Sequence, residues 1–342
     1  MLRGVAGMLM SIFLKLKYLI MRFVSIPDNG SSWRGRLPYR FVTDSGEAED
    51  VTVEIFDATT NSLLGAMRLY GVAEAEVDIA SYIRPHLSLK PIETARQIEL
   101  VTSPSAIAVV VRVNGSDSER RVFFRSQFDY TTVGPLSNYV LTQDLLLGDA
   151  VRLTLFAQSD ISVLATVKGV KSGTLKSLGS TRGMPMELVI PTSQLADVES
   201  ISLSIRLDNR VSVQYNYVVV ANMGGARRLV WYNAIGGVDS FIFDHSRRLA
   251  YSVKHTDAHL SMEGSMSVEG YIRYRLCSGY ELQAEMERVA ELLLSPVIFV
   301  EEGGSCRKVE VDSRDIAFDN KGMLHSIMLD ISEKWKGGGA LW

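Results

Sequence analysis

The sequence predicts a mainly β protein: two tandem antiparallel β-sandwich modules, followed by an α+β domain with one helix on an antiparallel sheet. Three observations point to this fold class. Short segments rich in Val, Ile, Thr and Tyr recur along the chain, separated by turn residues. Apolar residues at clear helical spacing occur only near residues 278–294. A pattern of strands that begins at Val51 returns about 100 residues later.

Length and composition limit the functions that we consider. The chain has 342 residues, which is typical of two or three domains. With 46% hydrophobic and 22% charged residues, it can bury substantial cores. The formal net charge of −3 argues against nucleic acid as a partner. Cys277 and Cys306 are too few for a disulfide framework and lack the Cys-x-x-Cys spacing of a metal knuckle.

Residues 1–24 are predicted to form an apolar N-terminal extension. The apolar run Gly4–Leu14 is too short to cross a bilayer by itself, and Lys15 and Lys17 follow it. Three interpretations remain open. The natural chain begins at Met21, or the segment is an amphipathic helix that packs on the body or on a partner, or it targets the chain to a membrane.

Residues 25–130 and 131–222 are predicted to form the two sandwich modules. Apolar and polar residues alternate in both ranges, as in strands that place one face on an opposing sheet and the other in water. The matching segments are Val51–Asp57 with Val151–Ala157, Ser62–Leu69 with Ser162–Gly169, Glu76–Ile83 with Glu187–Gln194, Ile107–Asn114 with Ser200–Asp208, and Arg121–Phe124 with Tyr215–Val220. Duplication and convergence both explain such a repeat; different strand orders would exclude duplication.

Residues 223–335 are predicted to form the α+β domain, and residues 336–342 a mobile tail. The domain begins with a hairpin in which two aromatic strands flank the glycine pair Gly236-Gly237. Ser278 and Glu281 have the spacing of a capping box, and Cys277 and Leu282 that of a hydrophobic staple. The residues of the apolar stripe on the expected helix are Leu282, Met286, Val289 and Leu293, before a stop at Ser295-Pro296.

The hairpin carries a resemblance to a known group of proteins. Trp-Tyr-Asn-x-x-Gly-Gly-x-Asp followed by aromatics resembles a signature of structural proteins from phages and prophages of the Bacteroidetes lineage. The segment after the helix, residues 294–299, is also similar to those proteins. The residues that carry the resemblance in the hairpin are Trp231, Tyr232, Asn233, Gly236, Gly237, Asp239 and Phe241.

The resemblance implies a virion structural protein, a tail or baseplate subunit that acts by assembly in the host bacterial cytoplasm. Its implied partners are other tail or baseplate subunits in a homo-oligomeric ring. We expect the aromatic residues of the hairpin to be buried between subunits. The alternative is a secreted or cell-surface β-sandwich module for binding or adhesion, which predicts an exposed aromatic platform.

The sequence offers one weak candidate for a chemical site. His255, Asp257 and His259 alternate along a predicted strand, so their side chains would share one face and hold a transition metal, with His245 or Glu263 completing the shell. The alternative, which we favour, is a polar strand that faces solvent. Phosphate-loop, dinucleotide, metalloprotease and nucleophile-elbow motifs are absent. We therefore expect no enzyme activity, cofactor, metal or small-molecule substrate.

Three arginine pairs are the remaining charged motif. Arg120-Arg121, Arg227-Arg228 and Arg247-Arg248 lie in β-rich sequence and do not form a basic track. We expect them to make salt bridges at the rims of the sheets. They are also suited to facing an acidic neighbour in an assembly.

Overall fold

The computed structural model describes residues 21–44, 46–90, 99–126, 133–137, 142–158, 160–169, 173–180, 183–195, 197–208, 211–221, 224–257, 266–312, 317–321 and 324–334. The chain forms two compact units. The first contains Met1–Ser88 and Ser105–Thr131, and the second contains Leu89–Pro104 and Thr132–Trp342. The mainly β, antiparallel fold predicted from the sequence is confirmed.

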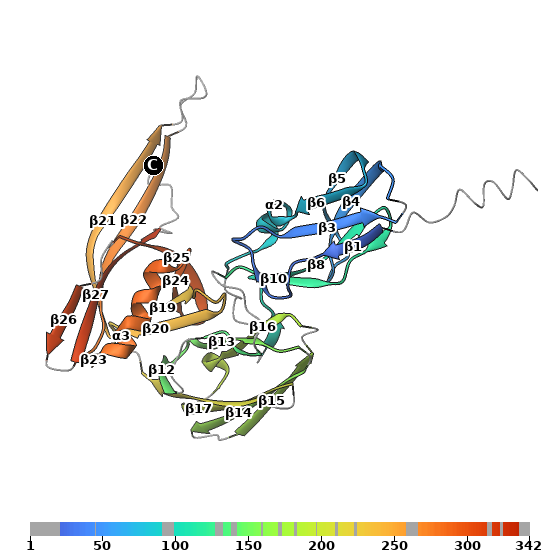
Figure 1. Cartoon of the computed structure of the whole chain (residues 1–342). Coiled ribbons are helices and arrows are strands. Elements are labelled where there is room, and N and C mark those ends of the chain that lie inside the picture. Colours follow the sequence, from blue (N-terminus) through green and yellow to red (C-terminus); the bar gives the residue numbers. More distant parts are fainter. Residues whose placement is uncertain are drawn as a thin grey trace, which may run out of the picture. The chain divides into compact units, whose positions relative to one another are not determined.

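The first unit is a β-sandwich (Figure 1). One sheet has the order β1-β3-β6, with strands β1 (Met21–Ser25), β3 (Pro38–Thr43) and β6 (Glu74–Asp78). The other has the order β2-β10-β8-β4-β5, with strands β2 (Ser31–Ser32), β10 (Arg121–Phe124), β8 (Ala106–Val113), β4 (Glu49–Asp57) and β5 (Leu63–Val72), and β9 (Ser116–Asp117) pairs with β8. Helices α2 (Ala80–Ile83) and η1 (Arg84–His86) follow β6. Alternate residues of each sheet point inward, so that Tyr39, Phe41, Val53 and Val111 share one core.

The second unit begins with another β-sandwich. Its first sheet has the order β11-β13-β16-β7, with strands β11 (Gly134–Pro135), β13 (Ala150–Phe156), β16 (Pro185–Pro191) and β7 (Glu99–Thr102). Its second sheet has the order β12-β18-β17-β14-β15, with strands β12 (Thr142–Leu146), β18 (Val211–Val220), β17 (Val198–Leu207), β14 (Asp160–Gly169) and β15 (Gly173–Ser180). The short helix η2 (Thr192–Gln194) follows β16. Strand β7 lies in sequence between β6 and β8 of the first sandwich, yet it pairs with β16 here.

The two sandwiches have the same strand order. In both, the first and sixth strands flank the third in one sheet, and a short second strand pairs in parallel with the last strand of the other sheet. Different strand orders would have excluded a duplication, and the two sandwiches do not differ in strand order. The segment matches from Glu76, Ile107 and Arg121 onward pair equivalent strands, since β6, β8 and β10 correspond to β16, β17 and β18.

The two earlier segment matches are wrong by one strand. The sequence pairs Val51–Asp57 with Val151–Ala157, but β4 corresponds by topology to β14, and β13 corresponds to β3. Likewise Ser62–Leu69 matches β5 to β14, whereas β5 corresponds to β15. Every strand repeats the same two-residue alternation, so a shift by one whole strand leaves the pattern almost unchanged.

The C-terminal part of the second unit is an α+β domain on a nine-stranded sheet, as far as the described residues show. The main path is β20-β19-β24-β25-β27-β22-β21. Its strands are β19 (Arg227–Tyr232), β20 (Val238–Phe243), β21 (His245–Asp257), β22 (Met266–Cys277), β24 (Ile298–Glu302), β25 (Ser305–Val311) and β27 (Leu324–Lys334), and both β23 (Glu281–Leu282) and β26 (Ala317–Lys321) pair with β27. Helix α3 (Gln283–Ala290) and η3 (Glu291–Leu294) pack on this sheet.

The predicted start of the helix is wrong. Helix α3 begins at Gln283 after Leu282, and no side chain caps it. The Ser278 hydroxyl instead accepts a hydrogen bond from the Ile327 amide at 2.8 Å, and Glu281 lies in strand β23, so neither belongs to a capping box. Leu282 is 57% exposed, which excludes both the staple with Cys277 and its place in the apolar stripe. Pairing of β23 with β27 takes up the residues that would have formed the first turn.

The rest of the predicted stripe is confirmed. Met286 and Val289 are buried in the core between helix and sheet, and Leu293 packs against that core from a partly buried position. Leu292 is also fully buried because the chain tightens into a 3-10 turn after Ala290, which rotates the next side chains relative to an α-helix.

Both predicted ends of the chain are only partly described. Residues 1–20 and the tail 336–342 lie outside the described residues. Residues 21–24, assigned from the sequence to the extension, form most of β1, and Met21 is buried in the core of the first sandwich. Within the described part of the chain, no helix is long and apolar enough to cross a membrane.

Candidate docking interface between the second sandwich and the C-terminal domain

Strands β13 and β16 are buried on both faces, whereas a sheet of a β-sandwich commonly has one face in water. All seven residues of each strand are buried. Val151, Leu153 and Leu155 enter the sandwich core, so Arg152 and Thr154 point to the opposite face. The C-terminal domain covers that outer face. Its strand β19 is likewise buried from Arg228 to Tyr232.

A buried ion-pair network lies at this contact. The Glu301 carboxylate binds the Arg152 guanidinium at 3.1 Å and the Arg228 guanidinium at 2.7 Å. Arg228 also donates to the Ser240 hydroxyl at 2.7 Å and to the Ala150 carbonyl, and Arg152 donates to the Gly304 carbonyl at 3.3 Å. Because these charges are removed from water, each one depends on its partners. The network joins the two domains through both arginines.

Asp149 is a second buried carboxyl at the contact. Its Oδ1 accepts a hydrogen bond from the Gly303 amide at 3.1 Å, and the residue is 3% exposed. Burial raises the pKa of Asp149 to about 7; nearby Arg228 opposes this rise, while Glu301 adds to it. The interface therefore contains a carboxyl that gains or loses its proton near neutral pH.

The hairpin motif forms the other half of the interface. The Asn233 side chain donates to the Leu136 carbonyl and to Asp239, both at 2.8 Å, and accepts the Gly237 amide at 2.9 Å. Asp239 in turn accepts from the Ser137 hydroxyl at 2.6 Å. The motif thus closes its own turn and at the same time binds Leu136 and Ser137, which directly follow β11 of the second sandwich.

Close packing explains the second glycine of the motif. A Cβ atom at Gly237 would lie 1.7 Å from the Leu136 carbonyl oxygen. The Val238 amide beside it donates to the Thr154 hydroxyl at 3.0 Å. Only glycine lets the two backbones approach this closely. Gly236 has a φ of 85°, which meets the turn geometry expected for the glycine pair.

Tyr232 links the hairpin to strand β16. Its hydroxyl lies 3.3 Å from Glu187, which also accepts from Ser103 at 2.9 Å. Burial, followed by the charge of Glu187, raises the pKa of Tyr232 above its usual range. Burial also raises the pKa of Cys306 to about 12, so its thiol stays protonated at physiological pH. The raised pKa values keep the Tyr232 hydroxyl and the Cys306 thiol protonated, so neither is an activated nucleophile.

The residues of the hairpin motif have contacts within the chain. Trp231, Tyr232, Asn233, Gly236, Gly237 and Asp239 are buried within the chain, and Phe241 is partly buried and stacks edge-to-face on Phe243 at 5.2 Å. They hold the C-terminal domain on the second sandwich.

The metal hypothesis is not tested by the structure. His255 and Asp257 lie in β21, but their side chains, and the whole of His259 and Glu263, are outside what the structure describes. His245 begins β21 and is exposed. Elsewhere in the described residues, no group of His, Cys, Asp and Glu is arranged to hold a metal ion.

The arginine pairs differ in their roles. Arg121 and Arg227 form the expected rim contacts, with Glu119 at 2.7 Å and Glu333 at 3.6 Å. Arg228, in contrast, is buried in the interface network, so the rim prediction is wrong for it. Arg247 and Arg248 are exposed on β21.

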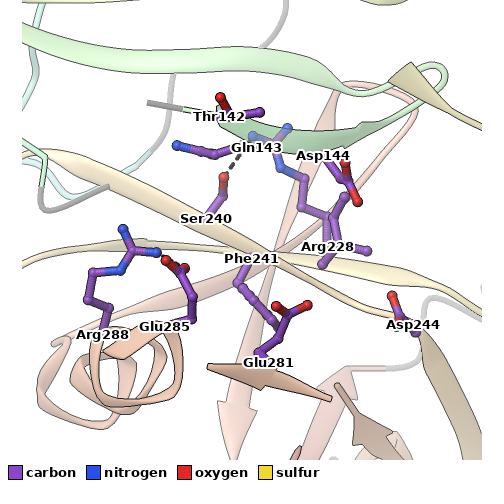
Figure 2. Close-up of a pocket in the computed structure, with 11 residues that line it drawn as sticks. Thr142, Gln143, Asp144, Arg228, Ser240, Phe241, Asp244, Glu281, Glu285 and Arg288 are labelled. Carbon is purple, nitrogen blue, oxygen red and sulfur yellow. Dashed lines mark hydrogen bonds and ion pairs between the residues drawn. The ribbon is translucent and has the colours of Figure 1, made fainter. Parts of the chain in front are cut away.

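A cavity of about 310 Å³ opens beside the network, between β12, β20 and α3 (Figure 2). Arg228 and Ser240 line it, as do Asp144, Asp244 and Glu281 (Figure 2). Burial raises the pKa of Glu281, and the charges of Asp244 and Asp144 raise it further. The cavity has charges of both signs and no paired nucleophile and base, so the geometry does not define a reaction.

Sequence reasoning missed Arg152, Glu187 and Glu301. One signal was present: β13 and β16 read as nearly continuous apolar runs with single polar residues at outward positions. Such runs are typical of strands that are covered on both faces. The pairing of Arg152 with Glu301, 149 residues later, has no local signature.

The fold and this site define a multidomain β-sandwich protein with a buried intrachain docking interface. No family model matches the chain, and no curated protein matches it. Among solved structures, one similar chain is CBD12 from CALX1.2, with 9% identity and a TM-score of 0.16 over 56% of this chain and 82% of that one. Another is Dpr2 Ig1-Ig2 in complex with DIP-Theta Ig1-Ig3, with 9% identity and a TM-score of 0.18 over 59% of this chain and 99% of that one. A third is DIP-gamma IG1+IG2, with 8% identity and a TM-score of 0.17 over 59% of this chain and 97% of that one. TM-scores this low support no statement of function.

Proposed function

We propose that this chain is a non-enzymatic structural subunit of a phage or prophage tail or baseplate, which acts by assembling with other copies and with neighbouring subunits. One observation carries the proposal: strands β21 and β22 form a hairpin that extends beyond the rest of its sheet (Figure 1). Their outer part, Val253–Asp257 paired with Met266–Gly270, lies beyond the residues that β27 pairs with.

An isolated two-stranded ribbon is marginally stable in water. Strand β21 has 13 residues, twice the usual strand length, and its pairing with β22 continues to Asp257. A ribbon of this length that nothing else in the described chain supports is suited to contact with another subunit. The buried docking interface agrees with such a role, because paired charges and hydrogen bonds join the second sandwich and the C-terminal domain.

The resemblance in the hairpin motif gives the proposal its biological setting. Its residues have a defined structural task here, which is to hold the C-terminal domain on the sandwich. A protein that must transmit force or hold register in a particle needs such fixed domain geometry. We infer a virion location and a homo-oligomeric ring from the resemblance, and we propose no nucleic acid, metal or small-molecule partner.

Detection in particles and the oligomeric state of the pure chain test this function. We expect mass spectrometry to find the chain in purified particles, and electron microscopy of the purified protein to show rings. A chain that stays monomeric at high concentration and is missing from particles would contradict the proposal.

The alternative is a surface or secreted module for binding or adhesion, and tandem sandwiches of equal strand order favour it. That function predicts an exposed aromatic platform. Tyr70, Tyr251 and Tyr280 are exposed, but they lie on β5, on β21 and before β23. Loss of binding to glycan arrays or host cells after Tyr70→Ala would support this alternative.

A further inference from the structure

The two sandwiches have the same strand order but differ at one sheet edge. In the second sandwich, the outer edge of β16 is paired with β7 over Glu99–Thr102. Strand β6 occupies the place of β16 in the first sandwich, and among the described residues no strand pairs with its outer edge. In the part of the chain that the structure describes, the sheet of the first sandwich ends at β6. The second sandwich adds a fourth strand at the equivalent position, and that strand, β7, comes from outside its own continuous sequence.

Strand β6 presents an acidic edge. Glu74, Glu76 and Asp78 share its outward face, while Val77 points into the core. Across the sheet, Glu76 lies opposite Arg40 on β3. Ion pairs with Arg36 and Arg40 leave both glutamates nearly half exposed, with 46% of the Glu76 side chain accessible. Across the sheet, the cation Arg40 on β3 is thus followed by the carboxylate of Glu76 on the edge strand β6. A further strand that carried cations beside β6 would continue this alternation of charge.

Strand β21, which ends the C-terminal sheet among the described residues, presents the opposite charge. On the C-terminal sheet, Asp330 holds Arg275 through two hydrogen bonds of 2.7 and 2.9 Å, and Arg275 lies directly opposite Arg247 on β21. Like charges opposite one another are unfavourable. The row therefore ends in two adjacent cations, and a strand with carboxylates beyond Arg247 would offset this repulsion.

Part of strand β21 is also exposed to solvent. Every residue from Arg247 to Ser252 is exposed, including Leu249 and Tyr251, the latter at 58%. The guanidinium of Arg248 lies 5.3 Å from the Tyr251 ring, which places a cation beside an exposed aromatic surface. A long exposed edge strand is a template for pairing with another chain.

We propose that β21 of one copy adds to the outer edge of β6 in a neighbouring copy, so that Arg247 faces the carboxylates of β6. The occupant of the outer β6 edge is thus a second copy of this chain, chosen by charge complementarity. Because the two edges are different surfaces, the contact is head-to-tail and leads to a ring or a filament. This inference rests on the proposed function and names the contact through which the subunits assemble.

Charge reversal of the full chain tests the contact. Variant A carries Arg247→Glu, and variant B carries Glu74→Arg with Glu76→Arg. Each places like charges across the contact, so we expect self-association, followed by sedimentation velocity, to weaken at least about tenfold in either variant alone. A control with Lys168→Glu and Arg206→Glu, two exposed cations on inner strands of the second sandwich, should assemble like the wild type.

Mixing the two variants provides the decisive measurement. The acidic β21 of variant A matches the basic β6 of variant B, and the unchanged edges match in the reverse direction. Equimolar A and B should therefore recover assemblies of wild-type size with alternating subunits, which native mass spectrometry would resolve. Restoration also shows that both variants are folded.

Three outcomes would overturn this contact. They are a wild-type chain that stays monomeric, variants that assemble like the wild type, and a mixture that stays dissociated although both variants melt like the wild type. The second and third would leave the proposed function standing, because the chain would assemble through another surface. Absence from particles would remove the proposed function, whatever the variants do.

Discussion

At the scale of single residues, the interface between the second sandwich and the C-terminal domain depends on closely packed and hydrogen-bonded atoms of Asn233 and Gly237. Asn233 uses both ends of its amide, and its neighbour Gly237 has a backbone oxygen where a side chain would be. The asparagine and the glycine are recognisable in the sequence, but their contact with Leu136 is not.

Gly237→Ala should disrupt this contact. The added methyl would overlap the Leu136 carbonyl oxygen, so the backbones must separate, and we expect a loss of about 3 kcal/mol in the free energy of unfolding. Urea denaturation of the full chain measures it. Gly225→Ala, where the nearest atom is 3.8 Å away, is the control and should change stability by less than about 1 kcal/mol. Equal losses would show that Gly237 has no special role.

Asp149 should make stability depend on pH. Its pKa is about 7 in the folded chain and near 4 when unfolded, so the folded state binds the extra proton between these values. The contribution of Asp149 to the unfolding free energy should therefore be fully present below pH 4, and should fall by up to about 4 kcal/mol as pH rises to about 7. Urea midpoints across this range measure the slope.

Asp149→Asn keeps an acceptor for the Gly303 amide and removes the charge. We expect it to stabilise the chain by a few kcal/mol at pH 8 and to have little effect at pH 4. The exposed Asp160→Asn is the control. A pH profile that Asp149→Asn leaves unchanged would mean that another group titrates.

At the scale of elements, strands β13, β16 and β19 are each covered on both faces. The inward apolar residues of β13 and β16 fill the sandwich core, and their outward polar residues pair across the domains. The apolar residues of β19 alternate between two clusters. Helix α3 is placed differently from its sequence prediction, because strand pairing between β23 and β27 outweighs the local capping pattern.

Glu301→Gln should be strongly destabilising. It leaves two buried guanidiniums without their counter-charge, and breaking a buried ion pair typically costs about 3–5 kcal/mol. The next residue provides a matched control: Glu302 pairs with Arg307 at 2.7 Å on the surface, and Glu302→Gln should cost less than about 1 kcal/mol. Chemical denaturation compares the two, and a similar loss in both would contradict the docking role of Glu301.

Alanine substitutions around α3 test its observed start. Met286→Ala removes a fully buried side chain and should cost about 2–5 kcal/mol. Leu282→Ala should cost less than about 0.5 kcal/mol, because Leu282 is exposed. Thermal melts in parallel decide between this structure and the capped helix of the sequence prediction, in which Leu282 would matter as a staple.

At the scale of the whole molecule, the two units do not follow the order of the sequence. Strand β7 lies within the sequence of the first sandwich, but Leu100 packs against the core of the second. The chain therefore leaves the first unit after Ser88 and returns to it at Ser105.

Leu100→Asp should weaken the second sandwich and leave the first intact. A charge in that core is unfavourable, and it would loosen the pairing of β7 with β16. Hydrogen exchange followed by mass spectrometry should show lost protection in β16 and none in β8 or β10. Val109→Ala, in the core of the first sandwich, should give the reverse pattern. Lost protection in β8 after Leu100→Asp would contradict the placement of β7.

The sequence by itself determined the fold class, the tandem sandwiches and the glycine turn, because these follow from two-residue alternation and local backbone geometry. It also pointed to Trp231, Tyr232 and Asn233 as the residues to examine. Only the tertiary structure decided where they act, which strand of one sandwich matches which of the other, that β7 crosses to the second unit and that Glu301 joins two arginines. Each of these depends on pairing between residues far apart in the chain, and such pairing leaves no periodic trace in the sequence.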